Sequence, residues 1–198
     1  MVIDIIKSIN WADLLILALS IRIMYMAANE GFIVEIFKCF SMIIALFLSF
    51  HYYFFFAKLL TGISFLSRQI ENPEDMVFTQ SACFIVIWIL PLIAFKYIRE
   101  GLLLLFSIKT KPVWDRWAGS ILGIGRCLVV ASMLMFVLLI SGIPYLEAKT
   151  VESFLGKRVV KIAPGMYKNV CDGFVSRLFS GQKYNQAVRE ALDKISLK

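Results

Sequence analysis

The sequence predicts an all-α, polytopic membrane protein, with about four transmembrane helices followed by a basic, amphipathic, helical C-terminal tail. Hydrophobic residues fill 60% of its 198 positions and the mean hydropathy is +0.78, whereas soluble domains average about 45–50% apolar residues. Four long apolar stretches recur, each near the ~20 residues that cross a bilayer as a helix. After the last stretch, apolar and basic residues alternate at helical spacing. We therefore expect a four-span membrane domain over residues 1–143 and a tail over residues 144–198.

The first two spans are expected at about residues 12–29 and 33–56. Arg22 interrupts the first span, so this helix depends on tilt, on snorkelling of the arginine, or on burial against other helices. A cleaved signal peptide is the alternative, but the segment lacks an A-x-A cleavage site and carries charges at its margins. The second span has no formal charge over residues 39–57 when His51 is neutral. A lone histidine there most often lies in the headgroup zone, and a proton relay is the alternative.

The third and fourth spans are expected at about residues 76–97 and 117–141. Pro91 removes one backbone hydrogen bond from the third span and should bend it. Beyond this span, residues 97–108 either continue the same helix or lie along the membrane surface. The fourth span should end at the Gly-Ile-Pro of residues 142–144, because glycine and proline stop helices.

The tail carries ten Lys or Arg against five Asp or Glu from Glu147 onward. Its apolar residues recur at helical spacing, and we expect a break at 163–165, Ala-Pro-Gly. Two interpretations remain open. The tail either lies on anionic lipid or holds a partner, or it folds as a small helical cap on the bundle, since both require one apolar and one charged face.

One face of the fourth span carries small residues. Gly119 and Gly123 stand four positions apart and share one side of the helix, where a neighbouring backbone can approach closely. Asp115 and Arg116 precede the glycines, and Arg126 follows them at a depth where an unpartnered charge is costly. We expect the glycines to form a close helix contact and the three charged residues to be structural or functional candidates.

Glu35, near the start of the second span, is the expected partner of Arg126. An arginine at the centre of a membrane helix costs ~2.5–3.5 kcal/mol on insertion scales, so each residue has reason to bind the other. The local alternative pairs Glu35 with Lys38 at i,i+3, and Arg126 then snorkels to headgroups. Gly31, between the first two spans, is a further helix-packing candidate.

These residues follow one another in a characteristic order: Gly31-Phe32-Ile33-Val34-Glu35, then His51-Tyr52-Tyr53, then Asp115-Arg116 followed by Gly119, Gly123 and Arg126. This order resembles the colicin V production protein family of bacterial inner-membrane proteins, in which the first element reads R-G-F-x-x-E. The similarity runs from about Asp13 to Leu139. Glu30 departs from the pattern, because the family commonly has a basic residue at that position.

The resemblance implies a four-span inner-membrane protein linked to toxin production or export. The sequence has no nucleophile elbow, phosphate loop or metal-ligand cluster, and one histidine provides little acid–base chemistry. The four cysteines form no CxxC pair, so we expect free structural thiols, no cofactor and no metal. We predict a non-enzymatic accessory or assembly protein. The alternative is a small transporter or channel that works as a homo-oligomer.

The expected partners are the lipid bilayer, anionic lipids bound through the tail, and either further copies of this chain or another membrane protein. The net charge of +7 does not indicate nucleic acid, because the basic residues are dispersed around apolar spans. Seven Lys or Arg of the connections and the early tail fall on the side of the N-terminus and five on the other side. We therefore expect both termini in the cytoplasm.

Overall fold

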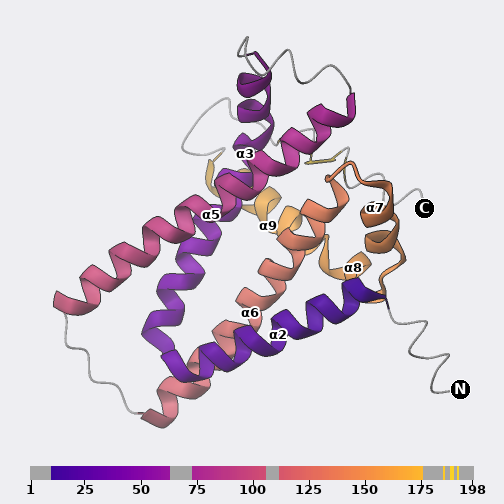
Figure 1. Ribbon diagram of the computed structural model, residues 1–198. Helices are drawn as coiled ribbons and strands as arrows, with labels where there is room; N and C mark the ends of the chain where they lie inside the picture. The colour runs from indigo at the N-terminus through magenta and orange to yellow at the C-terminus, as the bar shows by residue number, and fades with distance from the viewer. Residues whose placement is uncertain are drawn as a thin grey trace, which may run out of the picture.

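Every element in the described part of the chain is helical (Figure 1). The computed structural model describes residues 10–62, 73–105 and 112–175, and the later positions 185, 188, 189 and 191. Four helices are long and apolar enough to cross a membrane: α2 (Trp11–Glu30), α3 (Phe32–Gly62), α5 (Pro73–Leu105) and α6 (Pro112–Leu139). The prediction of an all-α protein with four membrane-spanning helices is confirmed.

The helix ends follow from local chemistry. Asn10 caps α2, because its side-chain oxygen accepts a hydrogen bond from the Ala12 amide at 3.1 Å. The helix ends at Gly31, whose φ of +87° is a conformation that glycine adopts readily. Gly142 also has a positive φ, +73°, and Pro144 begins the next helix. The end of the fourth span therefore lies close to the predicted position.

The two inner helices of the bundle are α3 and α6, which pack on each other; α5 packs mainly on α3, and α2 packs mainly on α6 (Figure 1). The third span continues through Pro91 to Leu105 as one helix. Residues 97–105 continue the third helix, which was one of the two alternatives for this segment. Residues 106–108 lie outside the described residues.

An aromatic cluster fills the centre of the bundle. The Phe50 ring of α3 lies 5.1 Å from Phe84 of α5 and 4.8 Å from Phe136 of α6, measured between ring centroids. Tyr53 contacts the same two rings, and Tyr167 from the tail stacks on Phe50 at 5.5 Å. All five side chains are buried. One tail residue therefore completes the core of the membrane-spanning bundle.

The described tail forms three short helices, α7 (Pro144–Glu152), α8 (Phe154–Val159) and α9 (Ile162–Val170), and a π-helical turn, Cys171–Val175. Ser132 of α6 ties them to the bundle, because its hydroxyl donates to the Val160 carbonyl at 3.1 Å and accepts from the Ala163 amide at 2.8 Å. The described tail residues therefore fold onto the bundle: α7 and α8 lie beside the end of α6 and the start of α2, and α9 lies against α3 and α6 (Figure 1). Folding onto the bundle is one of the two interpretations left open.

The helix break expected at residues 163–165 was wrong. Pro164 and Gly165 lie in the first turn of α9, where proline is tolerated because the first amides of a helix have no partner within it. A break lies instead at Ser153, whose hydroxyl accepts from the Gly156 amide at 2.7 Å and caps α8. Another separates α8 from α9 at residues 160–161.

Candidate functional site

Asp115 of α6 holds the turn between α2 and α3. Its Oδ1 accepts a hydrogen bond from the Phe32 amide at 2.8 Å, so the carboxylate satisfies a free N–H at the start of α3 and lies at the positive end of the helix dipole. A Cβ on Gly31 would overlap the same carboxylate. Glycine at position 31 therefore provides both the positive φ and the space for Asp115.

The two glycines of α6 lie against the end of α2. A Cβ on Gly119 would stand 2.9 Å from the carbonyl oxygen of Ala27, and a Cβ on Gly123 would overlap the Ala27 side chain. Both glycines are buried. The close contact predicted for this face is present, and its partner is the first span. The same helix turn brings Asp115 to Gly31, so one stretch of α6 fixes both α2 and the start of α3.

Glu35 lies at the centre of a charged network. Its side chain is fully buried, and Oε1 lies 3.2 Å from Nη2 of Arg126 and 3.1 Å from Nζ of Lys38. Lys38 also forms an ion pair with Glu30 at the end of α2. The interhelical pair and the local i,i+3 pair are both present, so one carboxylate oxygen serves two cations.

Two atoms of this network have no hydrogen-bond partner among the described residues, Oε2 of Glu35 and Nε of Arg126. Arg126 lines a half-enclosed cavity of about 430 Å³ between the four spans. Lys96 and Arg99 of α5 line the same cavity. Arg126 and two further cations, Lys96 and Arg99, thus line one cavity within the bundle.

The cavity contains two residues that the sequence did not indicate, and one residue that the sequence did indicate lies outside it. Lys96 and Arg99 stand near the end of the third span, and their spacing along one helix gives no sign of a shared cavity. Arg116, selected beside Asp115, is exposed and has no ion pair with any described residue. Asp115 was selected, but its role at Phe32 depends on a contact across 83 positions.

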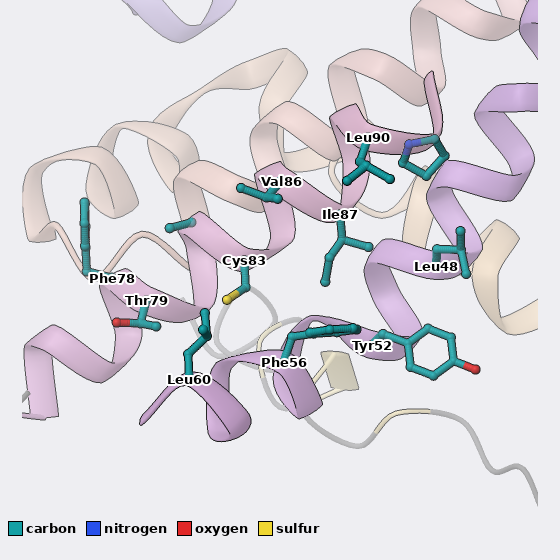
Figure 2. Close-up of a pocket in the computed structure, with 12 residues that line it drawn as sticks. Leu48, Tyr52, Phe56, Leu60, Phe78, Thr79, Cys83, Val86, Ile87 and Leu90 are labelled. Atoms are coloured by element: carbon teal, nitrogen blue, oxygen red, sulfur yellow. The ribbon is translucent and has the colours of Figure 1, made fainter. Parts of the chain in front are cut away.

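A larger cavity, of about 770 Å³, lies between α3 and α5 and is almost wholly apolar. Figure 2 shows Leu48, Tyr52, Phe56 and Leu60 from α3 opposite Phe78, Thr79, Cys83, Val86, Ile87 and Leu90 from α5. Such a lining suits acyl chains and offers few polar groups for chemistry.

His51 is half-buried beside the tail. Its ring stacks on Phe47 with centroids 5.2 Å apart, and Nδ1 lies 3.0 Å from the hydroxyl oxygen of Tyr167. The imidazole therefore joins α3 to α9. The described residues contain no group of three His, Cys, Asp or Glu able to hold a metal ion, and the four cysteines have free thiols.

The family model described as colicin V production protein matches residues 12–164 of the chain. The match begins in α2, contains every residue of the network and of the glycine contact, and ends in the first turn of α9. The resemblance seen in the sequence ended near Leu139, whereas the family match also includes α7 and α8. No curated protein and no solved structure matches the chain. Since the matched residues are well over half of its length, this four-span membrane protein belongs to the colicin V production protein family.

Proposed function

We propose that this chain is a non-enzymatic accessory or assembly protein of the bacterial inner membrane, acting in toxin production. The observation that supports the proposal is that the motif residues bind one another. Asp115 binds the start of α3 at Phe32, and Glu35 joins α3 to Arg126 of α6. Both contacts hold α3 against α6, and the contact of Gly119 and Gly123 with Ala27 adds α2. Three helices are thereby held in one arrangement, which is what a protein needs in order to present a fixed surface to a partner.

A fixed outer surface is offered by α2. Leu14, Leu17, Ile21 and Tyr25 are each between 52% and 71% exposed, and their spacing of three and four positions places them on one helix face. Because α2 packs mainly on α6, this stripe points away from the bundle. We propose that it contacts the partner, either a second copy of this chain or another membrane protein.

Copurification from a mild detergent tests the proposal. Wild-type protein should retain a membrane partner in fixed stoichiometry, and Ile21→Trp should lose it while keeping its folded yield. Ile93→Trp, on an exposed position of α5 outside both cavities (50% against 62%), is the matched control and should keep the partner.

The competing function is a small transporter or channel acting as a homo-oligomer, and the polar cavity beside Arg126 is the observation that favours it. Proteoliposomes that contain only the purified chain should show no flux of small ions or amino acids under our proposal. Saturable flux that Arg126→Gln abolishes, in a variant that still folds, would favour the transporter instead.

We also propose that both termini lie in the cytoplasm and that the tail meets anionic lipid. Asn10 Nδ2 donates to the carbonyl of Lys149 at 2.5 Å, so the start of the first span and α7 lie at the same end of the bundle. Lys157, Arg158 and Lys161 are exposed there, where they can face headgroups. A C-terminal reporter that is active only in the periplasm should be inactive, and an active reporter would reverse the orientation.

A further inference from the structure

The cavity beside Arg126 combines a cationic end with an apolar wall. Its basic lining consists of Lys38, Lys96, Arg99 and Arg126. The apolar wall includes Phe37, Met42, Leu92, Phe95 and Val130. Its volume of about 430 Å³ falls in the ~300–1,000 Å³ range of small-molecule sites. A ligand that fits both parts carries a negative charge on an apolar body.

The charges of the cavity do not cancel. Glu30 and Glu35 are both bound to Lys38, and Glu35 also binds Arg126, so these two carboxylates balance two cations. Arg99 has no ion-pair partner in the part of the chain that the structure describes.

Nζ of Lys96 lies 4.0 Å from Oε1 of Glu100, but the two side chains are 59% and 50% exposed, and such surface pairs contribute little. Two weakly engaged cations, Lys96 and Arg99, therefore remain for an anion.

The cavity lies where a membrane surface is expected. Glu30 is the last residue of the first candidate span, and Lys38 lies in the second turn of α3. Arg99 lies three residues before Leu102, where the third candidate span ends. Lipid phosphates occupy this level in either leaflet.

We propose that this cavity binds the phosphate of an anionic phospholipid, with Arg99 and Lys96 as donors. One acyl chain of the same lipid lies against Leu92, Phe95 and the other apolar side chains of the wall. The site is separate from the exposed α2 stripe and does not depend on the accessory function proposed above.

The test is the thermal unfolding midpoint of the purified full chain in detergent, measured while lipid is added. Phosphatidylglycerol should raise the midpoint in a saturable manner, and phosphatidylcholine with the same acyl chains should not. Arg99→Gln and Lys96→Gln should each weaken the apparent phosphatidylglycerol affinity about fivefold, the effect of one basic residue near a lipid surface. Both residues lie on the outer part of α5, so the variants should fold.

Arg116→Gln is the matched control, because it removes one exposed cation near the start of α6 without touching the cavity. Its affinity for phosphatidylglycerol should change less than about twofold. An equal loss in Arg116→Gln and Arg99→Gln would overturn the proposal, since diffuse surface charge would then explain binding. Inorganic phosphate at matched ionic strength separates a lipid site from a free-anion site. The same stabilisation by phosphate alone would overturn the lipid assignment, as would equal stabilisation by phosphatidylcholine.

Discussion

Replacing Glu35 and Arg126 singly and together by glutamine tests whether the buried network holds the bundle. Glutamine keeps the approximate size and removes the charge. A full charge reversal is less suitable, because an arginine at position 35 would place a second cation beside Lys38, which lies 3.1 Å from the native carboxylate. The three neutral variants therefore isolate the interhelical pair without creating a new repulsion.

The contacts set the expected magnitudes. Glu35 is fully buried and its Oε1 serves both Lys38 and Arg126, so Glu35→Gln leaves two cations short of an acceptor and should cost about 3–5 kcal/mol. Arg126→Gln leaves Glu35 paired with Lys38, so we expect a smaller loss of about 1.5–3 kcal/mol, the value of a hydrogen bond to a charged group. The double variant should lose less than the sum, with a coupling energy of at least ~1 kcal/mol.

The assay is an SDS titration in mixed micelles, followed by helix content and tryptophan fluorescence, which gives relative unfolding free energies. Arg116→Gln should leave the midpoint unchanged, because that side chain is exposed and unpaired within the described residues. Losses that add within ~0.3–0.5 kcal/mol would refute the interhelical pair. A strong coupling between Glu35→Gln and Lys38→Gln in that case would assign the stabilisation to the local pair.

Three further outcomes are expected. Gly123→Ala should cost about 1–3 kcal/mol because its methyl overlaps Ala27, and adding Ala27→Gly should restore much of the SDS midpoint. Gly125→Ala faces open space and is the control; equal losses at the two glycines would remove the packing argument. Asp115→Ala should cost about 0.5–2 kcal/mol by removing the cap of α3. Asp115→Asn keeps an oxygen acceptor and should retain most of the stability. Equal SDS midpoints for the alanine variant and wild type would contradict the cap. Burial raises the pKa of the Cys171 thiol, so little of the reactive thiolate is present at pH 7. In a variant whose other cysteines are replaced by alanine, maleimide labelling of Cys171 should be slow at pH 7, faster as the pH rises, and complete in SDS. Rapid labelling of the folded protein at pH 7 would contradict this.

Sequence patterns predicted the features that depend on spacing along one helix. The four spans follow from apolar length, and the glycine contact follows from Gly119 and Gly123 at i,i+4. The Glu35 contact with Arg126 could be inferred because two costly charges in an apolar setting each require a partner.

Features that depend on how helices meet could not be predicted from the sequence. Asp115 caps a helix that begins 83 positions earlier in the chain, and spacing on α6 alone cannot indicate this partner. Lys96 and Arg99 enter the cavity because α5 packs across α3, so their role depends on the packing of the two helices. Pro164 was interpreted as a break, but proline is also tolerated in the first turn of a helix, and that is where it lies in α9.

The pairing of α2 with α6 has a consequence for biosynthesis. The first span leaves the ribosome well before its main neighbour exists, since Ala27 contacts Gly119 and Gly123 of the fourth span. It is also the least apolar of the four spans, with a mean hydropathy of 1.6 against 2.1 to 2.3 for the others. During insertion we therefore expect α2 to lie in the bilayer with Ala27 against lipid until α6 is inserted. Insertion of the fourth span should then be the step that fixes the first span in the bundle.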